Sequence, residues 1–179
     1  MSGYTVIELI FVVMLTAILA AAAIPAATAG LERSRTLGAA RYLASQLALA
    51  RAQAAARSAN VALFLAGGRG VFSIGVYWDG NANGVRIRDI TAGLDPPIER
   101  PVRFADRFPR VLLFLNDPDS LSADTTALVS FSPIGTATSV TLYLRGPDNS
   151  QYAVRVLGAT GRTRVLRFVP GTRQWIEIV

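Results

Sequence analysis

The sequence of 179 residues contains no cysteine, no histidine and no lysine, so all 18 of its basic residues are arginines. Without cysteine the chain can form no disulfide, thiol nucleophile or cysteine-ligated zinc site. Without histidine it lacks the side chain that most often transfers protons near neutral pH, and a Ser-His-Asp triad is impossible. These absences exclude several large classes of enzyme, and we expect neither catalytic activity nor a cofactor.

Charge is nearly absent from the first 31 residues, where Glu8 is the one charged side chain. All the arginines and every other acid follow from Glu32 onward. Hydrophobic residues make up 51% of the chain, and its mean hydropathy of +0.38 is high for a freely soluble domain of this size. One end of the chain therefore favours an apolar environment and the other favours water, a division that excludes an ordinary cytosolic globular enzyme.

The apolar segment Tyr4–Ile24 has the sequence YTVIELIFVVMLTAILAAAAI. As a helix it would span roughly 31 Å, about the thickness of the hydrocarbon core of a bilayer. No basic residue precedes it, whereas a secretory signal peptide begins with a positively charged region. The pattern therefore predicts a transmembrane anchor. An ionised Glu8 inside a bilayer would cost about 2.5–3.5 kcal/mol, so this acid is expected to be functional and to need a cationic partner.

Residues 3–9, with the sequence GYTVIEL, resemble the cleavage and methylation motif of type IV prepilins and type II secretion pseudopilins. In that family a peptidase cuts after the glycine and methylates the new N-terminus. The resemblance implies that Gly3 precedes the cut, that Tyr4 becomes the first mature residue, and that Glu8 pairs with the terminal amine of a neighbouring subunit. The alternative is a plain anchor without processing. The leader of residues 1–3 is very short and has no basic residue, which puts the natural start site in question.

A helical pattern continues from Leu31 to about Asn60. Apolar residues recur there at steps of three and four, and arginines are interspersed between them. The recurring residues are Leu37, Ala40, Ala44, Leu47, Ala50 and Ala54. We expect this amphipathic helix to continue the anchor, with a loosening around Pro25 and Gly30, and to place its small apolar face against a sheet.

After Asn60 the chain is divided into short alternating segments by turn residues, which is typical of strands. The predicted strands are Val61–Ala66, Val71–Trp78, Gly84–Ile90, Val111–Leu115, Ala127–Ser132, Ser139–Arg145, Gln151–Leu157, Arg162–Val169 and Gln174–Val179. The order of elements predicts an α+β fold in which a long N-terminal hydrophobic helix packs on a C-terminal antiparallel β-sheet domain. We divide the chain into a leader (1–3), a transmembrane or filament-core helix (4–30), an amphipathic helix (31–60) and a β-rich head (61–179).

Four later segments narrow the resemblance to the GspH/FimT family of minor pseudopilins, and the likeness covers the whole chain. They are ALARAQA at 48–54 followed by VAL at 61–63, DGNANG at 79–84, FSPIG at 131–135 and GRTR at 161–164. The resemblance implies a structural subunit of a type II secretion pseudopilus or type IV pilus. Its expected partners are other subunits, the prepilin peptidase/N-methyltransferase and the bacterial inner membrane, which it would cross once with a periplasmic head. Whether it serves a secretion or a pilus machine stays open.

The segment 79–84 also matches the beginning of a calcium loop, in which alternating side-chain oxygens converge and a glycine allows a sharp turn. The position that should hold a bidentate glutamate is Ile90, so Asp79 supplies the one clear carboxylate. A polar hairpin turn built on Asn83 and Gly84 is the favoured interpretation.

Asp117, Asp119 and Asp124 gather in a second loop. Paired carboxylates can catalyse hydrolysis, but loop acids of this kind are usually solvated side chains, which is the favoured interpretation here.

The segment 161–164 suggests a second function. On a strand, Arg162 and Arg164 would share a face, and paired guanidinium groups suit phosphate oxygens. The motif is similar to the DNA-contacting motif of FimT-type minor pilins, which implies DNA as an alternative partner. The competing interpretation is a solvated strand in an arginine-rich protein. Because aromatic residues are sparse nearby, limited to Tyr152, Phe168 and Trp175, any DNA binding should be mainly electrostatic.

Overall fold

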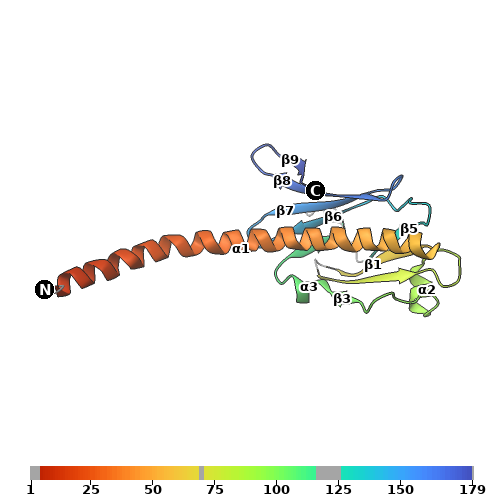
Figure 1. The fold of residues 1–179 in the computed structure, drawn as a ribbon, viewed down its shortest axis with the longest axis horizontal. Coiled ribbons are helices and arrows are strands. Elements are labelled where there is room, and N and C mark those ends of the chain that lie inside the picture. The colour runs from red at the N-terminus through yellow and green to blue at the C-terminus, as the bar shows by residue number, and fades with distance from the viewer. Residues whose placement is uncertain (1–4, 69–70, 116–125, 179) are drawn as a thin grey trace.

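A single helix of 52 residues, α1 (Val6–Arg57), dominates the computed structural model, which describes residues 5–68, 71–115 and 126–178. At 1.5 Å per residue the helix is about 78 Å long. Thr5 caps its N-terminus, where the Thr5 hydroxyl accepts a hydrogen bond from the backbone amide of Glu8. The helix ends at Arg57 and is capped by Ser58, which adopts a left-handed conformation with φ of 50°. Figure 1 shows the N-terminal half of α1 projecting from a strand-rich head.

The helix runs without interruption through Pro25 and Gly30. The loosening that the sequence suggested there does not break it, and the projecting half follows a gentle curve instead (Figure 1). The described helix therefore joins the apolar segment to the head as one continuous element.

The head contains two antiparallel sheets. The first has the strand order β3 (Val102–Arg103), β2 (Val71–Trp78), β1 (Val61–Gly68), β5 (Thr126–Phe131). The second has the order β4 (Leu112–Phe114), β6 (Val140–Arg145), β7 (Gln151–Leu157), β8 (Arg162–Val169), β9 (Gln174–Glu177). Two short helices, α2 (Ile87–Thr91) and α3 (Phe104–Arg107), follow β2 and β3. The predicted α+β class is confirmed.

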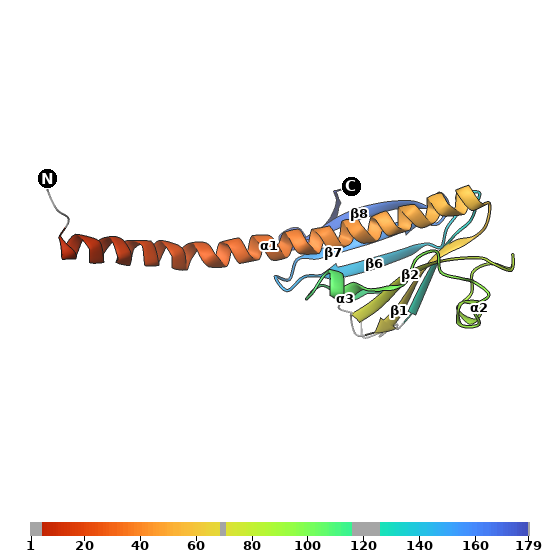
Figure 2. The same ribbon diagram turned by 60° about the horizontal axis from the view of Figure 1, so that its bottom comes forward.

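The C-terminal half of α1 packs across both sheets and closes the core between them (Figures 1 and 2). Its buried face consists mainly of alanine and leucine, and small side chains allow the helix to approach the strands closely. The buried helix residues are Ala39, Ala40, Leu43, Leu47, Ala50 and Ala54. They meet buried side chains of both sheets, among them Leu63, Leu65, Val129, Phe131, Leu142, Leu144, Val154 and Val165. This confirms that the small apolar face of the helix lies against sheets.

Most of the predicted strands are present, and three match the observed bounds of β2, β7 and β8. The strand predicted at Gly84–Ile90 is wrong, because residues 87–91 form helix α2. The short elements β3 and α3 were not predicted. Val179, the end of the last predicted strand, lies outside the described residues, and β9 ends at Glu177.

Candidate functional site

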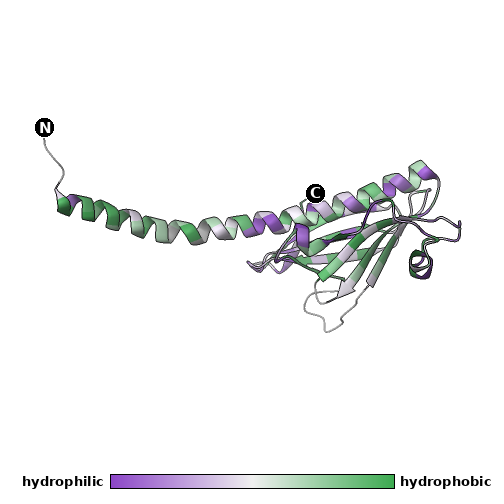
Figure 3. Cartoon of the chain, turned by 90° about the horizontal axis from the view of Figure 1, so that it is seen from below, coloured by the Kyte–Doolittle hydropathy of each residue, from purple (hydrophilic) through white to green (hydrophobic). Residues whose placement is uncertain are grey.

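The N-terminal half of α1 exposes apolar side chains on every side. Val6 and Ile7 are 75% and 77% exposed, and the exposed side chains continue to Leu31. In Figure 3 the ribbon of this half is coloured almost throughout as hydrophobic residues, whereas the half against the head is mixed. A helix that is apolar all round requires apolar surroundings on all sides. This surface can therefore bury itself among other helices or in lipid.

Among the described residues, no helix is both long enough and apolar enough to cross a membrane.

Glu8 lies in the first turn of α1 and is exposed. Thr5 and Glu8 have the spacing of a capping box, in which the first residue accepts a hydrogen bond from the amide of the fourth. An acid at this position also interacts favourably with the positive end of the helix dipole. Gly3 and Tyr4, the predicted processing residues, lie outside the described residues.

Ion pairs fix the place where α1 enters the head. Glu32 pairs with Arg35, at 2.9 Å, and with Arg110 from the loop before β4. One turn further along, Thr36 is fully buried and donates a hydrogen bond to the carbonyl of Glu32. Arg33 lies 3.7 Å from the carboxylate of Asp148. Charged contacts between α1 and loops of the head therefore begin where the exposed apolar surface ends.

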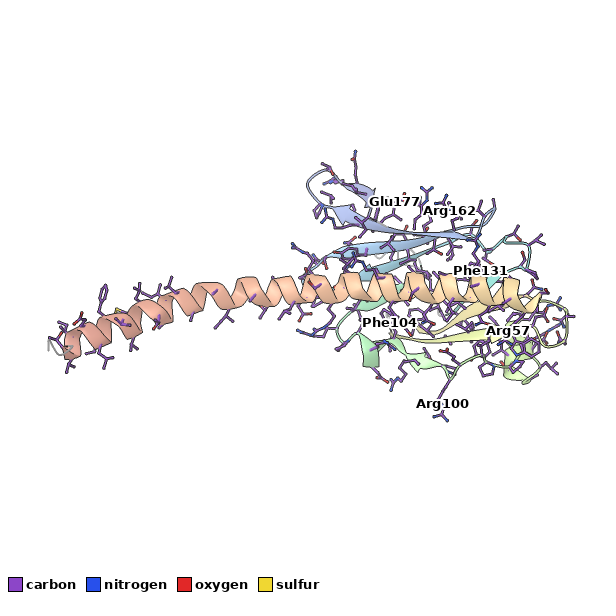
Figure 4. All side chains as sticks on the ribbon, viewed as in Figure 1. Arg57, Arg100, Phe104, Phe131, Arg162 and Glu177 are labelled. Carbon is purple, nitrogen blue, oxygen red and sulfur yellow. The ribbon has the colours of Figure 1, made fainter. Side chains whose placement is uncertain are left out.

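Arg162 and Arg164 both lie on β8, as predicted, but their surroundings differ. Arg164 donates a hydrogen bond of 3.0 Å to Glu177 on β9, so its charge is partly balanced. Arg155 on β7 is the cross-strand partner of Arg164 and adds a third guanidinium group to this region. Arg162 is exposed at the beginning of the strand. Figure 4 shows Arg162 and Glu177 on the same side of the head.

The aromatic residues near these arginines are not quite those that the sequence suggested. Tyr152 is 2% exposed and belongs to the core. Trp175 instead contacts Phe168 and Tyr143, with ring centroids 5.2 Å and 5.6 Å apart. Tyr143 was not predicted as part of this group, because the pairing of β6, β7, β8 and β9 that brings it there cannot be read from local sequence.

A groove of about 820 Å³ runs along the C-terminal half of α1. Small or polar helix residues form one wall, and the other wall comes from the loop after β5 and the beginning of β8. Its lining includes Arg41, Ser45, Ala48, Arg51, Ile134 and Arg162. Three segments that carried the family resemblance, at 48–54, 131–135 and 161–164, therefore meet at one place. We refer to this feature as the arginine groove.

Backbone amides of the loop after β2 donate hydrogen bonds to two aspartates of the same loop. The carboxylate of Asp79, which is 5% exposed, accepts hydrogen bonds from the amides of Asn83 (3.1 Å) and Gly84 (2.7 Å) and from the side chain of Asn60 (3.2 Å). Asp95 is fully buried and accepts hydrogen bonds from the amides of Gly80 and Arg86. Within the described residues no group of three or more potential metal-ligating side chains is found. The predicted polar turn is present, but it leads into α2 and not into a hairpin.

Asp89 on α2 lies beside the same loop. Desolvation is the largest single influence and raises the pKa of Asp89, but side-chain hydrogen bonds from Asn83 and Asn81 and the charges of Arg88 and Arg86 together lower that pKa below its ordinary value. The ionised form of Asp89 is therefore favoured in the folded chain. Together with Asp79 and Asp95, this carboxylate holds the loop in shape.

Comparison with known proteins gives one clear match. The family model described as type II transport protein GspH matches residues 39–161. The matched region includes the buried half of α1, both sheets up to the start of β8, and most of the lining of the arginine groove. No curated protein and no solved structure matches the chain. Since the family model spans well over half of the sequence, and the fold combines a long N-terminal helix with antiparallel sheets, the chain belongs to the GspH family of type II transport proteins, which are structural pseudopilus subunits.

Proposed function

We propose that this protein is a minor pseudopilin that joins a pseudopilus through the exposed half of α1. The observation that carries the proposal is the apolar surface from Val6 to Leu31, which is exposed around the whole helix. Burial of apolar surface contributes about 25 cal/mol per Å², so packing this segment among the helices of neighbouring subunits would drive assembly strongly. The head would project from the filament and contact other subunits.

The proposal includes processing and a membrane-inserted precursor. Cleavage after Gly3 and methylation of Tyr4 would leave a free amine at the mature N-terminus. Before assembly, the apolar half of α1 would hold the precursor in the inner membrane with its head in the periplasm. The precursor would thus have two partners before assembly, the inner membrane and the prepilin peptidase/N-methyltransferase. Mass spectrometry of the N-terminal peptide from filaments tests this directly, since an intact Met1 or an unmethylated Tyr4 would contradict it.

Glu8 would pair with the terminal amine of a neighbouring subunit inside the filament. Replacing it in the variant Glu8→Leu should leave insertion and cleavage intact but reduce incorporation into filaments about tenfold or more. The reason is that a buried amine without its partner costs roughly 3–5 kcal/mol. Immunoblots of sheared filaments and of membrane fractions measure the two steps separately.

The matched control is Glu99→Gln, which removes an exposed acid of the head and should assemble normally. Normal incorporation of Glu8→Leu would show that this acid has no role in assembly.

DNA binding is a second candidate function. It is favoured by the arrangement of Arg155 and Arg164, which are directly opposed on neighbouring strands with Arg162 close by on β8. Such a group can neutralise phosphates without reading bases. In this case the subunit would serve DNA uptake by a pilus machine, and the Arg162→Ala/Arg164→Ala double variant would assemble but lose uptake.

Titration of the full chain in detergent with duplex DNA at several salt concentrations tests this candidate. Each phosphate contact that is lost should reduce the slope of log affinity against log salt by about 0.9. Arg100→Ala is the matched control, because Arg100 is exposed and lies on the opposite side of the head (Figure 4). Equal salt slopes for the natural chain, the double variant and Arg100→Ala would contradict DNA binding by Arg162 and Arg164, which would then be solvated surface residues.

A further inference from the structure

Three arginines and no acid line the arginine groove. Arg41 and Arg51 lie on α1 and Arg162 lies at the beginning of β8, and no aspartate or glutamate is among the lining residues. Across the described part of the chain, none of these three side chains has an ion-pair partner. By contrast, Arg33, Arg35, Arg88, Arg110 and Arg164 all pair with acids. The groove therefore has an uncompensated positive charge.

The wall opposite the helix is shaped around Arg51. Gly161 has a φ of +61°, and a Cβ atom at that position would lie 3.2 Å from the side chain of Arg51 and 2.8 Å from the carbonyl of Gly135. Gly135 also faces Arg51, since a Cβ there would lie 3.9 Å from its guanidinium group. The two glycines thus leave room for the Arg51 side chain between the helix and the loops.

Between the arginines the groove is apolar. Ile134, at its rim, is 88% exposed, and alanines of α1 form the floor between Arg41 and Arg51. Arg41 and Arg51 are ten residues apart on one helix, which corresponds to about 15 Å along the axis. An extended peptide rises about 3.3 Å per residue, so two acids four residues apart would be about 13 Å apart and on the same face of the peptide.

We propose that the arginine groove binds an extended acidic segment of a neighbouring pseudopilus subunit. Carboxylates would pair with Arg41 and Arg51 through bidentate hydrogen bonds, and an apolar side chain between them would contact the alanine floor and Ile134. The groove begins at Arg41, about 15 Å along α1 from Leu31, the last residue of the exposed apolar half, and its occupant therefore meets it at the level of the heads.

This inference rests on the proposed pseudopilus role in one respect, which is that the acidic segment belongs to a neighbouring pseudopilus subunit. The groove itself is tested with purified full chain in detergent and labelled heptapeptides, by fluorescence anisotropy. The first peptide carries glutamates at its second and sixth positions, leucine at its fourth and serine elsewhere. The second replaces both glutamates by glutamine, and the third places the two glutamates side by side. A failure here would leave assembly through α1 untouched, since Glu8 and the apolar half of the helix are not involved.

We expect the first peptide to bind at least about tenfold more tightly than the glutamine peptide, and more tightly than the peptide with adjacent glutamates. Arg41→Gln and Arg51→Gln should each weaken its binding about tenfold, whereas Arg100→Gln should not change it. Arg51→Lys should keep part of the affinity, because it retains the charge but not the planar fork.

Ser45→Trp fills the groove without changing any charge and should abolish binding, which keeps the test valid if Arg51→Gln fails to fold. Equal binding of the glutamate and glutamine peptides would overturn the proposal, as would binding that none of the groove variants changes. Displacement of the peptide by duplex DNA, with the same dependence on Arg51, would identify a nucleic-acid site and overturn it as well.

Discussion

The backbone conformation at position 161 explains why a glycine precedes the two arginines of β8. The φ of Gly161, +61°, lies in the left-handed region, where a side chain costs about 1–2 kcal/mol. A side chain would also meet the carbonyl of Gly135 and the side chain of Arg51. The glycine is therefore required by the turn between β7 and β8 and by the packing of Arg51, whatever Arg162 and Arg164 bind.

Gly161→Ala should lower the free energy of unfolding by about 1–3 kcal/mol, from backbone strain and the close contact together. Gly171→Ala is the matched control, because its added methyl group meets no atom within 4 Å. Its effect should stay within about 0.5 kcal/mol. Denaturant unfolding of both variants in the same detergent measures the difference, and equal stabilities would show that the turn tolerates a side chain.

The acid dependence of stability should be partly due to Asp89. Because the pKa of Asp89 is lower in the folded chain than its ordinary value of 3.8, the folded state binds this proton more weakly than the unfolded state. The stabilisation is then present above about pH 4 and is lost as the pH falls through the lower folded pKa.

Asp89→Asn should therefore have a lower melting temperature than the natural chain at neutral pH, and the difference should shrink below about pH 4. Thermal unfolding followed by circular dichroism at a series of pH values measures this. Asp106→Asn, which changes an exposed acid of α3, serves as the control. A difference that stays constant down to about pH 2 would assign the effect to packing and not to ionisation.

At the scale of the element, the two halves of α1 differ in composition and in surroundings. Up to Leu31 it exposes apolar side chains on all sides, and from Thr36 it buries one face against the sheets. Leu47 is fully buried on that face, whereas Leu49, two residues later, is 38% exposed. The same residue type in the same helix thus experiences two environments.

Leu47→Ala should lower the free energy of unfolding by about 2–5 kcal/mol, because it leaves a cavity between α1 and the sheets. Leu49→Ala should change it by less than about 1 kcal/mol, because its side chain already contacts solvent. Parallel denaturant titrations distinguish the two. A large loss for Leu49→Ala would mean that the outer face of the helix is also packed.

The elements could be predicted where local pattern and tertiary packing agree. The strands β2, β7 and β8 have turn residues at both ends, and β7 also alternates clearly, so their bounds were predicted correctly. The segment Gly84–Ile90 also alternates, but it does not form a strand. The amides of Gly84 and Arg86 donate hydrogen bonds to Asp79 and Asp95, and the residues from Ile87 onward form α2. Long-range hydrogen bonds of this kind leave no local signal, and β3 and α3 are too short to give one.

At the scale of the whole molecule, the sequence singles out individual residues but does not predict how distant segments meet. Short motifs predict roles for Glu8 and Arg162, and these roles stay predictions. The arginine groove could not be predicted, because Arg51, Ile134 and Arg162 are far apart in sequence and become neighbours only when α1 lies across both sheets. The ion pair of Arg164 with Glu177 likewise depends on the pairing of β8 with β9.

The head should fold without the exposed half of α1. Thr36 is the first buried residue of the described chain, and the hydrophobic core begins at Ala39. A fragment that starts at Leu31 keeps the Glu32 ion pairs and should unfold cooperatively, within a few degrees of the full chain. Circular dichroism and size-exclusion chromatography check this, and an unfolded fragment would mean that the apolar half contributes to the stability of the head.

The uninterrupted helix also determines how the protein would carry mechanical load. A pull applied along the exposed half of α1 passes through one rod from Val6 to Arg57, with no flexible joint at the entrance to the head. Because the rod contacts both sheets, that load is resisted in shear by many side-chain contacts at once and not by one strand at a time. The head should therefore follow the motion of its helix as a rigid load.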